Sequence, residues 1–146
     1  MTTIAWDGHM LAVDSQTSSG DSVAIFANKL IKTEDGWLTG CGKLEHVYML
    51  KAYLDGDLKE LPEGLDATCF HITRKFFHRY EGGGFAMPIT KFKTTKMATG
   101  TGWVWAQAAM DFGCNAKEAV EYAKKRDIYT GGKVNCVEII PRHMGR

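Results

Sequence analysis

No apolar run in this sequence approaches the roughly 20 residues that a membrane-spanning helix needs. The first residues also lack the basic region and the long apolar segment of a secretory signal. Lysine and arginine together number 18 and aspartate and glutamate 17, so the formal net charge is only +1. With so little excess charge, the composition does not favour nucleic acid or an anionic membrane as a partner. We therefore expect a cytoplasmic protein with neither partner.

Metal-binding and redox motifs are also missing. The sequence contains four cysteines: Cys41, Cys69, Cys114 and Cys136. They show no C-x-x-C spacing and lie among apolar neighbours, which predicts reduced, buried thiols in a cytosolic chain. The five histidines lack the spacing of metal ligands on a helix. The glycine run at 82–84 is not part of a phosphate-binding motif. We expect no metal and no cofactor.

The predicted elements favour an α+β fold in a single domain, residues 1–146. The chain is long enough to bury its own core, and its 45% hydrophobic and 24% charged content is typical of globular proteins. The predicted order is strands, one helix, strands, two helices and a last strand. This order is neither a β-α alternation nor all-β. It predicts two antiparallel sheets stacked face to face, with helices 43–55, 103–112 and 116–126 on the outside.

The individual elements follow from apolar spacing and capping signals. Residues 43–55 carry apolar side chains at helical spacing, and Gly56 ends this segment. Asn115 and Glu118 have the spacing of a capping box at the start of helix 116–126. Strands are predicted at residues 3–6, 10–13, 29–33, 37–39, 67–72, 75–80 and 133–140, loops at 16–22 and 57–66, and a loop with a short strand at 85–96.

The N-terminus is the first candidate for chemistry. A small residue follows Met1, so aminopeptidase trimming would expose Thr2 as the first residue. An N-terminal threonine combines a hydroxyl nucleophile with its own α-amine, a base whose pKa in free peptides is about 7.7–8.0. Many chains begin Met-Thr by chance, however, so the N-terminus alone does not identify a nucleophile.

The residues after Thr2 predict a buried hairpin. Residues 3–6 and 10–13 are short β-prone runs, and Asp7-Gly8 between them is a typical pair for the two central positions of a type I′ turn. Such a hairpin would bring Asp14 back toward Thr2.

Six segments occur in one order along the chain: Thr2-Thr3-Ile4-Ala5, Ala12-Val13-Asp14-Ser15, Lys29-Leu30, Thr39-Gly40, Ala98-Thr99-Gly100-Thr101-Gly102, and Arg126-Asp127-Ile128-Tyr129-Thr130-Gly131-Gly132-Lys133-Val134. Together they resemble a proteasome β-subunit and, equally, the bacterial proteasome-like peptidase that works with an ATP-dependent unfoldase. Both are N-terminal nucleophile hydrolases. The resemblance covers nearly the whole chain except residues 56–96. It implies an αββα sandwich, threonine-type hydrolysis of peptides or unfolded proteins, a homo-oligomer and a possible unfoldase partner.

The resemblance assigns a first group of site residues. Thr2 matches the nucleophile, Lys29 the lysine that lowers the proton affinity of the nucleophile, and Asp14 the acid that orients this lysine. A buried lysine beside an amine must pair with a carboxylate or lose its charge, which fits this trio. Gly40 matches the glycine whose backbone N–H faces the developing oxyanion. Gly42 is the rival, because the local alignment is uncertain by a residue or two.

The resemblance also assigns a second group. Thr101 stands where the family has a serine that hydrogen-bonds near the amine of the nucleophile. Asp127 and Thr130 match an Asp-x-x-Ser-Gly pair, with threonine in place of serine. Each polar residue also has an ordinary interpretation: a solvated strand-edge lysine at Lys29, a turn-capping acid at Asp14, and an acid at a helix C-terminus at Asp127. The helix dipole disfavours the last of these.

Two departures from the family keep alternatives open. Residues 57–66 predict a loop that leads directly to a strand, where the family has a second long helix that helps rings to assemble. A retained Met1 would also block the α-amine. The first alternative is therefore a catalytically silent member that serves as a binding or assembly module. The second is an amidase that applies the same chemistry to a small molecule.

Overall fold

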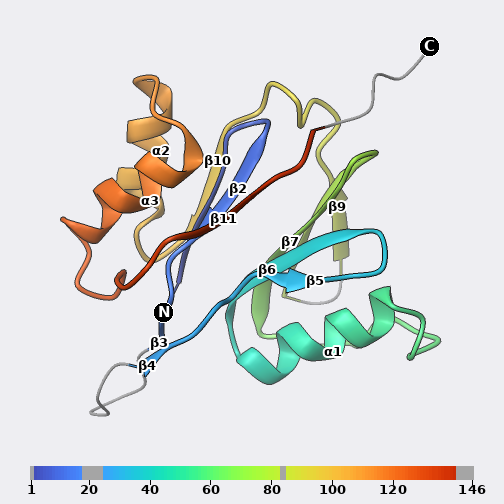
Figure 1. Cartoon of the computed structure of the whole chain (residues 1–146). Helices are drawn as coiled ribbons and strands as arrows, with labels where there is room; N and C mark the ends of the chain where they lie inside the picture. The colour runs from blue at the N-terminus through green and yellow to red at the C-terminus, as the bar shows by residue number, and fades with distance from the viewer. Residues whose placement is uncertain (1, 18–24, 83–84, 141–146) are drawn as a thin grey trace.

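The computed structural model describes residues 2–17, 25–82 and 85–140 (Figure 1). Its helices are α1 (Leu44–Leu54), α2 (Trp103–Asp111) and α3 (Ala116–Lys124). Its strands are β1 (Thr3–Trp6), β2 (Met10–Val13), β3 (Gln16–Thr17), β4 (Ile25–Phe26), β5 (Ile31–Lys32), β6 (Gly36–Gly42), β7 (Ala67–Thr73), β8 (Phe77–Glu81), β9 (Phe85–Pro88), β10 (Met97–Gly100) and β11 (Asn135–Glu138). None of the helices in these described ranges has the length and apolarity to cross a bilayer.

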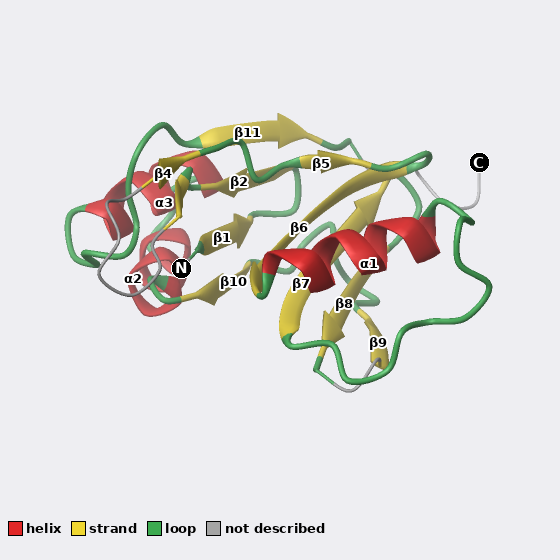
Figure 2. Cartoon of the chain, turned by 90° about the horizontal axis from the view of Figure 1, so that it is seen from below, coloured by secondary structure: helices red, strands yellow, loops and turns green. Residues whose placement is uncertain are grey.

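Two antiparallel sheets form the centre of the molecule. One has the strand order β10-β1-β2-β11 and the other β5-β6-β7-β8-β9, while β3 and β4 pair as a short separate ribbon. Helices α2 and α3 pack on the four-stranded sheet, and α1 packs on β6 and β7 of the five-stranded sheet (Figures 1 and 2). This arrangement confirms the predicted α+β sandwich with helices on its outer faces.

Side-chain alternation along β1 separates two of the apolar cores. Ile4 and Trp6 point between the sheets, where they pack with Phe70 and Phe77 of the five-stranded sheet. The Trp6 and Phe77 rings meet edge to face with centroids 6.1 Å apart. Ala5 points the other way, into the core beneath α2 and α3. Because successive strand residues face opposite sides, one short buried strand supports two layers at once.

Alanine dominates the layer beneath α2 and α3. Ala12 of β2 meets Ala106 of α2 and Ala119 of α3 in the same buried cluster. Small side chains let the helices lie close to the sheet. The predicted capping box of α3 is present: Glu118 N–H donates to Asn115 Oδ1 at 2.8 Å, and Asn115 N–H donates to Glu118 Oε1 at 3.0 Å. The helix therefore begins at the predicted residue.

The turn of the first hairpin differs from the type I′ prediction by one residue. Gly8 and His9, rather than Asp7 and Gly8, occupy its central positions, and Gly8 alone of the pair has a positive φ, +101°. Asp7 opens the turn instead, and its Oδ1 accepts hydrogen bonds from the N–H groups of His9 and Met10. This side-chain capping favours Asp7 at the first position of the turn.

Other predictions need correction. Residues 97–100 form β10, which was not predicted, and β3 occupies the start of the expected 16–22 loop, with β4 after that loop. Residues 18–24 lie outside the described ranges.

Of the four cysteines only Cys69 is buried, and Cys136 is exposed because β11 is an edge strand. Between α1 and β7 the described chain has turns but no second helix, as predicted.

Candidate active site

Thr2 directly precedes β1 and lies beside the turn that leads from β10 into α2. The backbone N–H of Thr101 donates to the Thr2 carbonyl oxygen at 3.0 Å. Gly100, whose φ is +96°, allows this close approach, because a Cβ at that position would lie 1.7 Å from the same oxygen. Thr2 itself is only 7% exposed. The backbone of Thr2 is therefore held in a fixed position next to Thr101.

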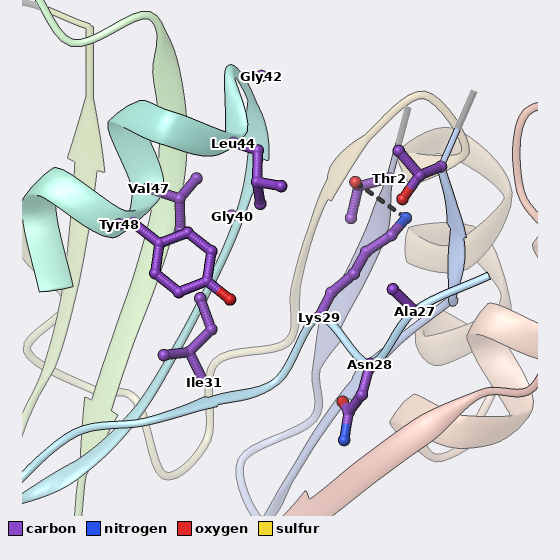
Figure 3. Close-up of a pocket in the computed structure, with 11 residues that line it drawn as sticks. Thr2, Ala27, Asn28, Lys29, Ile31, Gly40, Gly42, Leu44, Val47 and Tyr48 are labelled. Atoms are coloured by element: carbon purple, nitrogen blue, oxygen red, sulfur yellow. Dashed lines mark hydrogen bonds between the residues drawn. The ribbon is translucent and has the colours of Figure 1, made fainter. Parts of the chain in front are cut away.

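A lysine and a carboxylate converge on the Thr2 hydroxyl. Lys29, from the segment between β4 and β5, donates from Nζ to Thr2 Oγ1 at 3.1 Å (Figure 3). The same ammonium donates to Asp14 Oδ1 at 3.0 Å. The Asp14 carboxylate is fully buried and also accepts hydrogen bonds from the N–H groups of Thr3 and Gly131, at 3.0 and 3.1 Å. The predicted hairpin thus brings Asp14 back to the N-terminal strand.

Burial alters the proton affinity of Lys29. Desolvation lowers the pKa of Lys29, and the Asp14 carboxylate offsets this effect only in part. While it is charged, the ammonium favours the deprotonated form of groups beside it. Lys29 is therefore placed to lower the proton affinity of a hydroxyl or an amine at Thr2.

A second cluster surrounds Asp127. The hydroxyls of Thr101 and Thr130 both donate to Asp127 Oδ2 at 2.6 Å, and the backbone N–H of Tyr129 donates to Oδ1 at 3.1 Å. Burial opposes ionisation of this carboxyl, but the three hydrogen bonds outweigh it, so the pKa of Asp127 lies below its ordinary value. The cluster therefore contains a carboxylate anion, and it adjoins Thr2 through Thr101.

A cavity of about 300 Å³ opens beside Thr2. Thr2 and Lys29 line one end of it, and apolar side chains from β5 and α1, including Ile31, Val47 and Tyr48, line the other (Figure 3). Its volume is at the low end for small-molecule sites and fits one or two amino-acid side chains better than a large ligand.

The backbone of Gly40 faces this cavity at the edge of β6. Thr33 N–H donates to the Gly36 carbonyl at 3.0 Å, which shows that Gly36 presents its backbone groups toward β5. The backbone groups of successive residues in a strand point to opposite sides, so those of Leu38 and Gly40 point to the same side as those of Gly36. Leu38 pairs with Ile31, but β5 begins at Ile31, so within the described ranges no strand partner stands opposite Gly40. On this side, the Gly40 N–H and C=O therefore have no strand partner among the described residues.

Close packing behind Gly40 explains the glycine. A Cβ there would lie 2.6 Å from Cys69 Sγ and 3.0 Å from Val47 Cγ2. Gly42, the rival for the oxyanion role, also lines the cavity and has a φ of +112°. Both candidate glycines thus line the same cavity as Thr2.

Thr3 is a site residue that the sequence did not point to. All seven predicted residues lie around Thr2, in the Lys29 group, in the Asp127 group or at the cavity. Thr3 joins the two groups, with its N–H on Asp14 and its hydroxyl 2.6 Å from that of Thr130. The signal was a polar side chain two residues before Ala5, on the same buried face of β1, where a hydroxyl needs a partner.

Comparison with known proteins places the fold. No protein-family model and no curated protein sequence matches the chain. The solved structures of similar fold include HslV from Trypanosoma brucei, with a TM-score of 0.73 and 17% identity over 95% of this chain and 99% of that one. They also include BPH from Thiobacillus denitrificans, alone (TM-score 0.73, 17% identity, 94% and 96% covered) and in complex with epoxomicin (0.69, 17%, 94% and 97%). The chain therefore shares its fold, two stacked antiparallel sheets between helices, with HslV and BPH.

Proposed function

We propose that this chain is a threonine-type peptidase of the proteasome-like group, with Thr2 as its nucleophile once Met1 is removed. One observation carries the proposal: Lys29 Nζ lies 3.1 Å from Thr2 Oγ1 and 3.0 Å from the buried Asp14 carboxylate, beside an apolar cavity. The shared fold with HslV and with BPH, which was solved in complex with epoxomicin, supports it.

The proposed reaction has two stages. The freed α-amine of Thr2 accepts the hydroxyl proton as Oγ1 bonds to the peptide carbonyl carbon, and the charge of Lys29 keeps the amine unprotonated beforehand. The backbone N–H of Gly40, or of its rival Gly42, stabilises the oxyanion. The C–N bond then breaks and the amine passes its proton to the leaving nitrogen. Water, activated by the same amine, hydrolyses the acyl-enzyme.

The second cluster has a supporting role in this proposal. Thr101 holds the Thr2 carbonyl through its N–H and donates its hydroxyl to Asp127. With Thr130, it would fix the negative charge of Asp127 near the N-terminal residue and orient the amine for proton transfer.

The proposal extends to substrates and assembly. We expect peptides or unfolded proteins as substrates, a cytoplasmic homo-oligomer and an ATP-dependent unfoldase as partner. The apolar lining of the cavity favours an apolar side chain next to the cleaved bond.

A free amine at Thr2 should be essential for turnover. The experiment uses one preparation with an N-terminal tag whose removal leaves Thr2 as the first residue, assayed before and after tag cleavage. General-base catalysis is worth on the order of 10²–10⁴-fold, so cleavage of a fluorogenic peptide pool should rise at least about 100-fold. If the tag-free, folded protein cleaves no peptide or amide, the binding or assembly module replaces the peptidase. Cleavage of small amides alone would favour the amidase.

Shortening Tyr48 should change which peptides are preferred. Tyr48 is half exposed and lines the end of the cavity opposite Thr2, so Tyr48→Ala should enlarge the cavity with little effect on stability. We expect the ratio of kcat/KM for phenylalanine over alanine next to the cleaved bond to rise about tenfold, within the range for small changes in an apolar pocket. Tyr122→Ala on α3 is the matched control. An unchanged ranking would show that this cavity does not bind the side chain.

A further inference from the structure

We infer that Thr3 is a positioning residue for the proposed reaction: its hydroxyl fixes the Asp127 cluster while its N–H fixes Asp14. The inference rests on the proposed function and adds a residue to that same site. Thr3 is fully buried and directly follows Thr2.

The hydroxyl of Thr3 stands in a continuous chain of hydrogen bonds. Gly102 N–H donates to Thr3 Oγ1 at 2.9 Å, Thr3 Oγ1 lies 2.6 Å from Thr130 Oγ1, and Thr130 donates to Asp127 Oδ2 at 2.6 Å. The two ends of this chain, the Gly102 N–H donor and the Asp127 carboxylate acceptor, determine which group donates in each hydrogen bond. A carboxylate only accepts, so Thr130 gives its proton to Asp127 and accepts the proton of Thr3. Thr3 in turn accepts from Gly102.

The packing around this chain leaves it little room to rearrange. A Cβ on Gly102 would lie 2.5 Å from Thr3 Oγ1 and 3.0 Å from Thr130 Oγ1, so the glycine lets both hydroxyls approach. Without the Thr3 hydroxyl, the Gly102 N–H and the Thr130 oxygen would each lose a partner in a buried site. Thr130 could then rotate away from Asp127, and the proton order of the cluster would no longer be fixed.

The backbone of Thr3 serves the other cluster. Its N–H donates to Asp14 Oδ1 at 3.0 Å, the same oxygen that accepts from Lys29, and its carbonyl accepts from Asp14 N–H at 3.2 Å. Thr3 thus connects the lysine group and the Asp127 group through the residue next to the nucleophile. Small displacements of such a connection have large effects on a reaction that depends on near-contact geometry.

The test compares three variants of tag-free protein. Thr3→Val removes the hydroxyl with little change in shape, and Thr3→Ser keeps it. Thr39→Val is the matched control, because Thr39 is equally buried and its hydroxyl has no hydrogen-bond partner among the described residues. We expect Thr3→Val to lower kcat at least about tenfold with KM within about twofold of wild type. Thr3→Ser should recover kcat to within about threefold, and Thr39→Val should match wild type.

The outcomes separate this inference from the proposed function. If wild type is active and Thr3→Val has an unchanged kcat, or Thr3→Ser is as slow as Thr3→Val, the positioning role is wrong while the peptidase stands. If tag-free wild type has no activity, the peptidase fails and the inference fails with it. Thermal unfolding shows whether each variant is folded. Should Thr3→Val not fold, Thr3→Cys keeps a similar size with only a weak S–H donor and should show the same selective loss of kcat.

Discussion

Lys29→Ala is expected to abolish peptide turnover while the protein remains folded. The change removes the ammonium that lies 3.1 Å from Thr2 Oγ1 and leaves the buried Asp14 carboxylate without its counter-ion. We expect a cost of about 3 kcal/mol in unfolding free energy, at the low end for a broken buried pair, because two backbone N–H groups still bind Asp14. Any residual activity should have its acid limb at higher pH, since loss of a neighbouring positive charge raises the pKa of the amine.

Lys51→Ala is the matched control for Lys29→Ala. Lys51 also pairs with an aspartate, Asp55, at 2.6 Å, but on the surface of α1 outside the cavity lining. Its loss should leave kcat/KM unchanged and have little effect on the free energy of unfolding, because water and salt screen an exposed pair. Turnover and chemical denaturation of both variants distinguish a catalytic role of Lys29 from a purely structural one. Wild-type kcat in folded Lys29→Ala would show that Lys29 serves the structure only.

Thr2→Ala is expected to have the largest effect on activity and one of the smallest on stability. The substitution removes the proposed nucleophile, so turnover should fall by on the order of 10³-fold or more. Thr2 has a small side chain at the rim of a cavity, and its loss should change the unfolding free energy by less than about 1 kcal/mol. Steady-state assays and thermal unfolding of tag-free protein test both parts. Retained turnover would mean that another group attacks the substrate.

Short-range patterns allowed much of the fold to be predicted from sequence. The alternation at Ile4 to Trp6 and the return of Asp14 follow from strand periodicity, and the capping box of Asn115 follows from local hydrogen bonding. The role of Lys29 could not be predicted from such local patterns. Residue spacing alone could not separate a solvated lysine from a buried one, and only its order with Thr2 and Asp14 suggested the site.

The features that were missed depend on distant parts of the chain. β10 has only four residues and ends at Gly100, so it has no clear local strand signal; its pairing with β1 defines it. The hydroxyl of Thr3 finds its partner 127 residues away, at Thr130. Such a contact exists only after the sheet and the segment following α3 have assembled. Sequence periodicity shows that Thr3 is buried, but it does not show which groups Thr3 binds.

The most direct measurement of the central claim is covalent labelling of tag-free protein by a peptide epoxyketone, followed by intact mass and peptide mapping. This probe needs both the hydroxyl and the free amine of one N-terminal threonine, so it reports nucleophile and base together. The account predicts one stable adduct per chain, located at Thr2 and absent from Thr2→Ala and from tagged protein. A folded, tag-free wild type that never labels at Thr2, or that labels at another residue, would contradict it.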